Sequence, residues 1–294
     1  MRRILALAPF LAVVGCAVGE APEGDNSGVT GNPDGSNPDV DSDGDGLFDA
    51  DEVAANADPS NPDTDGDGLI DGDEILNGAD PTVVDTDADG YTDRDEVFEG
   101  KDPADPESRI YIGNWPYYFD KELITAGGFT GNAEVGHRFG RVQTKDQHGD
   151  VVDLFDFYNA DKPVVIDISA QWCGPCQAMA TWIGGDGDPA GYGPLWPAGP
   201  DVIERGDVYW VTILAEDRYG DPARKPTATE WSRDFPAEEI AVLADDNYQA
   251  TEYVNISYFP TLVLLDPDLK VAVVERSPDP YGAVFAELRK RFPQ

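Results

Sequence analysis

Cysteine and histidine are scarce in this sequence. Its 294 residues include three cysteines and two histidines. A structural zinc site takes about four cysteine or histidine ligands, and neither His137 nor His148 stands at ligand spacing from the cysteines. The composition therefore argues against a zinc site.

Basic residues are also few. The chain has 20 lysines and arginines against 58 aspartates and glutamates, a formal net charge of −38. A protein that binds nucleic acid needs a basic surface for the phosphates, so this balance excludes a nucleic-acid partner. The apolar run Ile4–Val14 is shorter than the roughly 20 residues that cross a bilayer as a helix.

The N-terminus has the pattern of a signal peptide. A short basic start precedes the apolar run, which ends in Val13-Val14-Gly15-Cys16. This ending resembles the lipobox of bacterial lipoproteins, which implies removal of residues 1–15 and lipidation of Cys16. The resemblance implies a lipid-anchored protein of the bacterial cell envelope, and Ala17 after the cysteine favours the outer membrane over the inner one. A secretory signal with an incidental cysteine is the alternative.

Residues 16–40 are predicted to be the lipidated cysteine and a flexible linker. The stretch after Cys16 is rich in Gly, Pro, Asn, Ser and Asp and has almost no bulky apolar residue. Such a segment cannot bury enough apolar surface to fold.

A motif of 12 residues recurs three times at a period of 22 residues within 41–105. Each copy has Asp at positions 1, 3, 5 and 9, Gly at position 6 and Glu at position 12. In calcium-binding loops, oxygen ligands at alternate positions surround one Ca²⁺ and the final glutamate binds through both oxygens. The predicted Ca²⁺ ligands are Asp41, Asp43, Asp45, Asp49, Glu52, Asp63, Asp65, Asp67, Asp71, Glu74, Asp85, Asp87, Asp89, Asp93 and Glu96.

About ten residues separate consecutive loops, too few for the two flanking helices of an EF-hand. The repeats resemble thrombospondin type 3 repeats, which implies an extended calcium-loop region with little regular secondary structure. Thr92 stands where the other copies have Phe48 and Ile70, so the third copy departs from the other two in its packing.

The charge of residues 41–105 supports bound cations. This segment holds 23 acidic residues against Arg94 and Lys101. Without cations, carboxylates within a Debye length of about 10 Å repel one another and keep the segment expanded. An acidic, disordered spacer is the alternative interpretation.

Cys173 and Cys176 enclose only Gly-Pro, and the residues on either side predict where this pair lies. Val164–Ile168 is apolar and β-branched, which is typical of a buried strand. The residues after Cys176 have helix-forming content up to Gly184. Cys173 is therefore expected where a strand gives way to a helix N-terminus, a position that favours the reactive thiolate. A structural disulfide is the alternative, although so short a loop gains little stability from closure.

The run from Trp172 to Cys176, with Asp167 six residues before the first cysteine, resembles thioredoxin. Tyr258-Phe259-Pro260-Thr261 is similar to the thioredoxin segment whose cis proline faces the disulfide, and residues 141–154 resemble a strand pair of TlpA/ResA-type extracytoplasmic reductases. The resemblance covers residues 136–294. It implies an α/β, thioredoxin-like fold with a central mixed sheet flanked by helices.

The same resemblance implies roles for five residues. Cys173 is the attacking thiol and Cys176 the resolving thiol, and the two form the redox disulfide. Asp167 takes up the Cys176 proton, whereas Pro260 and Trp172 shape the groove for the client. The alternative for Asp167 is an ordinary strand-end acid that reaches solvent. The redox domain needs no further cofactor.

Other segments are predicted from periodicity alone. Expected strands cover 208–214, 240–243, 262–265 and 271–274, and expected helices cover 229–235, 249–254 and 281–291. The aromatic connecting segment 106–135 is expected to pack against the redox domain. A Gly/Pro-rich insertion at 186–200 and Ser169, in place of an aromatic residue, depart from the family pattern.

Two functions of different classes fit these features. The first is a membrane-tethered, extracytoplasmic thiol–disulfide oxidoreductase that reduces or exchanges disulfides of client proteins, uses an unidentified electron donor, and stands on a calcium-stiffened spacer. The second is a calcium-dependent adhesion or scaffold protein whose thioredoxin fold only binds a partner. The intact cysteine pair favours the first, because a binding module needs neither thiol, and Gly-Pro between the cysteines favours a reducing couple.

Overall fold

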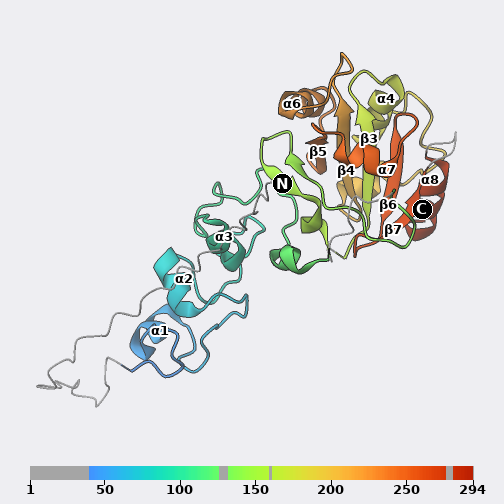
Figure 1. Cartoon of the computed structure of the whole chain (residues 1–294). Coiled ribbons are helices and arrows are strands. Elements are labelled where there is room, and N and C mark those ends of the chain that lie inside the picture. Colours follow the sequence, from blue (N-terminus) through green and yellow to red (C-terminus); the bar gives the residue numbers. More distant parts are fainter. Residues whose placement is uncertain (1–39, 126–131, 159–160, 276–280, 294) are drawn as a thin grey trace, which may run out of the picture.

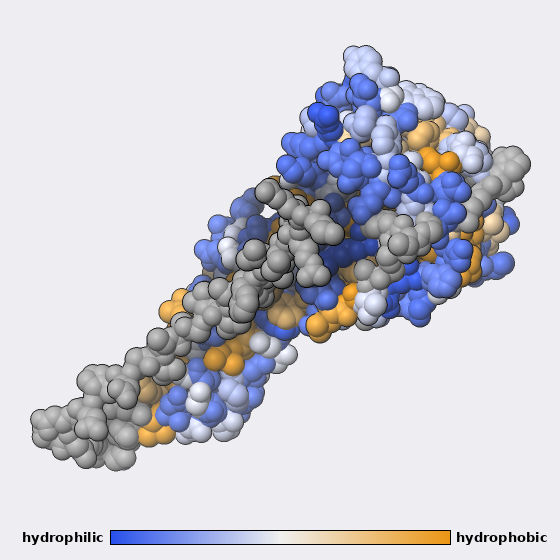
Figure 2. Space-filling view, viewed as in Figure 1, coloured by the Kyte–Doolittle hydropathy of each residue, from blue (hydrophilic) through white to orange (hydrophobic). Residues whose placement is uncertain are grey.

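The computed structural model describes residues 40–125, 132–158, 161–275 and 281–293. Figure 1 shows a row of three short helices leading to a wider part that contains the sheet. Figure 2 shows a mostly hydrophilic surface along this row, interrupted by small apolar patches. The predicted signal peptide, Cys16 and the linker lie outside the described residues, apart from Val40.

Each calcium-type loop leads into one short helix. The helices are α1 (Asp49–Ala55), α2 (Asp71–Asn77) and α3 (Asp93–Glu99). The extended loop region thus contains one seven-residue helix in each repeat, which begins at loop position 9 and extends three residues beyond position 12. Three acidic residues in each first turn favour the helix N-terminus, and a left-handed residue ends each helix.

Consecutive repeats are joined by the aspartate at loop position 5. An Oδ2 atom of Asp45 accepts a hydrogen bond from the backbone N–H of Gly72 at 2.9 Å. Asp67 accepts one from the N–H of Arg94 at 3.0 Å in the same way. A side chain at Gly72 would bring a Cβ to 2.7 Å from the carbonyl oxygen of Asp45, so this close approach requires glycine.

A five-stranded mixed sheet forms the centre of the wider part. Its order is β5-β4-β3-β6-β7, with β3 parallel to β4 and antiparallel to β6. This arrangement confirms the predicted α/β, thioredoxin-like fold. The strands are β3 (Val164–Ala170), β4 (Tyr209–Glu216), β5 (Ile240–Ala244), β6 (Thr261–Leu265) and β7 (Val271–Val274).

The two faces of the sheet bury different apolar clusters. On β3, Val165 belongs to the cluster that contains α4, α5, α6 and α8, whereas Ile166 belongs to the cluster on the other face, which contains α7. This alternation follows from the two-residue period of a strand. The helices are α4 (Gly174–Ile183), α5 (Gly199–Glu204), α6 (Lys225–Asp234), α7 (Gln249–Val254) and α8 (Gly282–Arg291). The start of α6 lies four residues before the predicted one, because Pro226 suits a first helical turn.

A hairpin covers the edge strand β5. It consists of β1 (Gln143–Lys145) and β2 (Val151–Asp153) and continues into the 3-10 helix η2 (Leu154–Phe157). The Gln147 side chain donates to the carbonyl of Ile240 and accepts from the N–H of Val242. These bonds satisfy backbone groups that an open sheet edge would expose.

The connecting segment joins the third repeat to the redox domain. Tyr91, at loop position 7, is 5% exposed and packs in one cluster with Trp115 and with core residues of the sheet. Its hydroxyl donates to the carbonyl of Trp115 at 2.7 Å, and the Trp115 indole donates to Asp146 in the β1–β2 turn at 2.8 Å. Tyr111 donates to Asp156 at 2.6 Å, and η1 (Phe119–Leu123) follows. The third repeat is thus packed against the domain, in agreement with the expected packing of this segment.

We expect Tyr91→Phe to lower the free energy of unfolding of the redox domain by about 1–3 kcal/mol, because it removes a buried donor from the Trp115 carbonyl. Urea denaturation followed by tryptophan fluorescence measures this. Tyr219→Phe is the control, since Tyr219 is 81% exposed, and it should change stability by less than about 0.5 kcal/mol. Equal effects of the two variants would contradict the junction described above.

Candidate redox site and calcium loops

The two cysteines lie where β3 gives way to α4. Cys173 and Cys176 form a disulfide with their Cα atoms 5.3 Å apart. Cys173 is 3% exposed and Cys176 is fully buried. The strand is buried along its whole length, so its end fixes the position of the turn that carries the pair.

The backbone around Cys173 suits a thiolate. Cys173 is the N-cap of α4, and its Sγ accepts a hydrogen bond from the N–H of Cys176 at 3.2 Å. Pro175 occupies the first turn and has no N–H of its own. A helix N-terminus stabilises negative charge, and thiolate is the form that attacks disulfides.

Two aromatic residues border the disulfide. Trp172 is 52% exposed, and its ring lies edge-on to Phe259 with the centroids 5.8 Å apart. The Phe259–Pro260 peptide bond is cis. The Trp172 indole donates to Glu216, the last residue of β4, at 2.7 Å. Sequence reasoning missed Glu216, because only the register of β3 and β4 brings it beside the cysteine turn.

Asp167 lies inside the sheet and does not reach solvent. Its side chain is fully buried, and it shares a sheet face with Val165, whose cluster includes Cys176. The Ser169 hydroxyl donates to Asp167 at 2.8 Å, and Thr212 lies at 3.5 Å. Burial raises the pKa of the Asp167 carboxyl from 3.8 to about 7, while these hydroxyls act in the opposite direction.

The Gly/Pro-rich insertion packs against α4. Tyr192 and Trp196 are buried in one cluster with Trp182 and Phe285. A side chain at Gly199 would bring a Cβ within 3 Å of Trp182, so glycine permits the close packing here. The insertion thus contacts both α4 and α8, a placement that its Gly/Pro composition did not predict.

The predicted calcium ligands gather in three places. Carboxylate oxygens from positions 1, 3 and 5 lie within 4.8 Å of one another in each loop. Glu52, Glu74 and Glu96 at position 12 are fully buried, and none of their carboxylate oxygens has a hydrogen-bond partner. Unpartnered buried carboxylates are costly, and a hard cation with oxygen ligands satisfies them. The residues therefore fit Ca²⁺.

The pKa values of these three glutamates also fit a cation site. Burial, followed by the neighbouring aspartates, raises the pKa of Glu52 to about 7 and that of Glu74 and Glu96 to about 8. The protein thus holds each carboxyl where a negative charge is disfavoured unless a cation compensates it.

Position 9 behaves differently from the other ligand positions. The carboxylates of Asp49, Asp71 and Asp93 accept bonds from the backbone and hydroxyl of Ser42, Thr64 and Thr86, respectively. Asp71 also groups with Asp45 and Glu52 of the preceding repeat within 4.8 Å. The structure thus brings one position-9 aspartate towards the neighbouring loop, which a pattern confined to one repeat did not predict.

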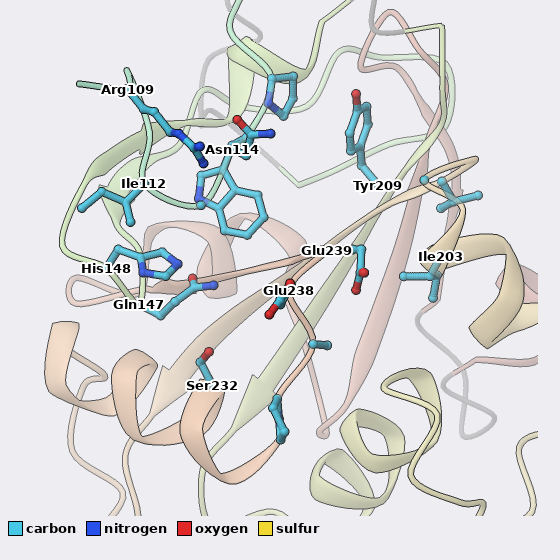
Figure 3. A pocket seen from close by; sticks show the side chains of 17 residues that line it. Arg109, Ile112, Asn114, Gln147, His148, Ile203, Tyr209, Ser232, Glu238 and Glu239 are labelled. Atoms are coloured by element: carbon cyan, nitrogen blue, oxygen red, sulfur yellow. The ribbon is translucent and has the colours of Figure 1, made fainter. Parts of the chain in front are cut away.

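A cavity of about 610 Å³ lies between the connecting segment and the sheet domain. Figure 3 shows Arg109 and Asn114 on one wall, with Glu238 and Glu239 on another. Neither cysteine lines it, so it is separate from the dithiol.

A buried disulfide at a strand-to-helix turn, on a mixed five-stranded sheet, is the arrangement of a thioredoxin-fold dithiol protein. Comparisons with known proteins agree. Residues 145–184 match the thioredoxin family model, and residues 41–62, 63–83 and 85–106 match the bacterial TSP3 repeat model. The chain contains a thioredoxin domain preceded by three bacterial TSP3 repeats.

Individual relatives match parts of the chain of different lengths. The mitochondrial thioredoxin of Rattus norvegicus is 38% identical over 58 residues, which cover 18% of this chain and 35% of that protein. A putative thiol:disulfide interchange protein DsbE from Chlorobium tepidum has 22% identity and a TM-score of 0.38, covering 54% of this chain and 98% of its own. An exposed lipoprotein thioredoxin from Streptococcus pneumoniae has 18% identity and a TM-score of 0.35, covering 50% and 99%.

Within the described part of the chain, no helix combines the length and the apolarity of a membrane span.

We expect stability to fall as pH rises from about 4 to about 7, because the folded protein holds a proton on Asp167 that the unfolded chain releases near pH 3.8. The loss contributed by this one group is at most about 4 kcal/mol. Asp167→Asn should make this slope shallower by the share of Asp167 and be the more stable protein above pH 7, measured with Ca²⁺ present so that the loop glutamates stay compensated. Urea denaturation across this range measures both.

The exposed Asp201, replaced as Asp201→Asn, is the control and should keep the slope. A wild-type slope that survives in Asp167→Asn would mean that Asp167 is not the group responsible.

Proposed function

We propose that this protein is a membrane-tethered, extracytoplasmic thiol–disulfide oxidoreductase that reduces or exchanges disulfides of client proteins. The observation that carries the proposal is the Cys173–Cys176 disulfide at the N-terminus of α4, with the sulfur of Cys173 accepting the Cys176 N–H. A disulfide that served stability alone would gain little from closing so short a loop.

The reaction follows from thiol–disulfide exchange. The Cys173 thiolate attacks one sulfur of a client disulfide; a Cys173–client bond forms and the other client sulfur leaves as a thiolate. Cys176 then attacks the Sγ of Cys173, the Cys173–Cys176 disulfide forms, and the client departs reduced by two electrons. A dithiol donor must reduce the protein again before the next cycle.

Burial suits Cys176 to the role of the resolving thiol. Cys176 is fully buried, so it is protected from clients until Cys173 holds one in place. Asp167 is proposed as the acceptor of the Cys176 proton, since its pKa of about 7 lets it take up and release a proton near neutral pH. Trp172 and Pro260 are proposed to border the client groove.

The three repeats are proposed as a calcium-stiffened spacer. The buried glutamates without partners support bound Ca²⁺, and the Asp45–Gly72 and Asp67–Arg94 bonds support a fixed geometry between repeats. Together with lipidation at Cys16, proposed from the lipobox, the spacer would hold the dithiol at a set distance from a membrane. The outer membrane is the proposed location.

We expect reduction of insulin by this protein, with dithiothreitol as donor, to fall to the rate of dithiothreitol alone in Cys173→Ser. Cys176→Ser should instead accumulate a mixed disulfide with the client, visible on a non-reducing gel, because the resolving thiol is absent. Cys16→Ser removes a cysteine outside the pair and should keep the full rate. A wild-type rate at background would refute the enzyme and favour a binding module.

We expect a chelator to increase the radius of gyration of the repeat region, measured by small-angle X-ray scattering, because uncompensated carboxylates repel one another.

Glu74→Gln should weaken calcium binding at the second loop in calorimetry by about tenfold or more. Asp73→Asn removes a neighbouring, exposed charge and should change the affinity far less. Equal losses in the two variants would indicate a diffuse charge effect in place of a built site.

A further inference from the structure

Tyr192 reaches the active-site turn from the Gly/Pro-rich insertion. It is 2% exposed, and its hydroxyl donates to the carbonyl oxygen of Pro175, between the two cysteines, at 3.0 Å. This insertion departs from the family pattern, and the reaction described above makes no use of Tyr192.

The contact involves the amide group whose N–H donates to the sulfur of Cys173. The carbonyl of Pro175 and the N–H of Cys176 belong to the same peptide group, and that N–H donates to the Sγ of Cys173 at 3.2 Å. A chain of hydrogen bonds therefore runs from the Tyr192 hydroxyl through one amide to the reactive sulfur. Such bonds polarise one another, so a donor at the oxygen makes the N–H a stronger donor.

The tyrosine is held in place on both sides. Its N–H and that of Gly193 donate to the Asp188 carboxylate at 2.6 and 2.9 Å. Its ring lies edge-on to Tyr281, with the centroids 5.3 Å apart, and also contacts Trp182. Burial raises the pKa of the Tyr192 hydroxyl well above its usual range, so the group remains a donor at every pH at which the dithiol works.

We propose that Tyr192 is a positioning residue for the reactive thiolate. Its hydroxyl strengthens, through the Pro175–Cys176 amide, the hydrogen bond that stabilises the Cys173 sulfur in its charged form. This inference rests on the proposed role of Cys173 as the attacking thiol. It gives the insertion a function: to make the dithiol more acidic and less reducing than the turn alone would.

The variant that tests this is Tyr192→Phe, which keeps the ring and its packing and removes only the hydroxyl. We expect the acid constant of the Cys173 thiol to fall about threefold, since hydrogen bonds to charged groups are strong and cooperativity changes them by a fraction. The thiolate absorbance of the reduced protein at about 240 nm, titrated against pH, measures this acid constant.

The redox equilibrium is a second readout. Loss of thiolate stabilisation favours the disulfide, so the equilibrium constant against glutathione should shift about threefold towards the oxidised protein, or about 14 mV to more negative potential. In the amide NMR spectrum of the reduced protein, the Cys176 proton should move upfield. If Tyr192 served packing alone, removal of its hydroxyl would leave the acid constant, the redox equilibrium and the Cys176 amide shift unchanged.

Other titratable groups face this site and must be held constant. They are Asp167 of β3, Asp188 of the insertion, Tyr281 before α8 and Glu216 at the end of β4. Tyr192→Phe replaces none of them, and it also removes the hydrogen bond that the Tyr192 hydroxyl shares with Tyr281. The control is Tyr91→Phe, which removes another buried hydroxyl from a backbone carbonyl far along the chain from the cysteines and should leave all three readouts unchanged.

The outcomes separate this inference from the proposed function. An unchanged acid constant and potential in folded Tyr192→Phe would overturn the inference, even if insulin reduction is normal. A threefold shift in a protein that reduces no insulin would uphold the inference and refute the reductase. If Tyr192→Phe fails to fold, incorporation of 3-fluorotyrosine at position 192, whose hydroxyl is a stronger donor, should shift the acid constant in the opposite direction, and no shift would overturn the inference.

Discussion

The turn from β3 into α4 is the constraint on which the rest of the redox domain depends. β3 is buried on both faces and paired on both edges, so its last residue has little freedom. The next residues must therefore place Cys173 at a helix N-terminus, where backbone donors meet its sulfur. Every other element near the site contributes by packing against this turn.

The residues around the turn either have a proposed part in the reaction or hold the turn in place. Asp167 lies beneath it, with an acidity set by burial and by Ser169. Trp172 is tied to β4 through Glu216, and Tyr192 contacts the peptide group between the cysteines. Glu216 and Tyr192 belong to segments outside this strand and turn, β4 and the insertion. The electrostatics of the dithiol therefore depend on the whole face of the sheet that carries α4.

The repeats follow a different physical rule. Their stability cannot come from a large apolar core, because charged residues dominate them. Instead, the carboxylates of each loop gather at positions that suit Ca²⁺, and one hydrogen bond joins each repeat to the next. Only the third repeat departs, since Tyr91 stands where Leu47 and Leu69 stand in the others and reaches the domain core. The third repeat is therefore held in a defined orientation against the sheet domain.

The sequence alone determined much of the fold and the three calcium-type loops. The β-branched run before Cys173, the regular loop positions and the amphipathic last helix are local patterns, so they predicted the strand, the three loops and α8. The helix of each repeat was not predicted, because four of its seven residues belong to the loop pattern itself. Only the tertiary structure decided that Glu216 and Tyr192 lie beside the cysteine turn, and that Tyr91 joins the repeats to the domain. Those contacts depend on strand register and on packing between distant segments, which no local pattern records.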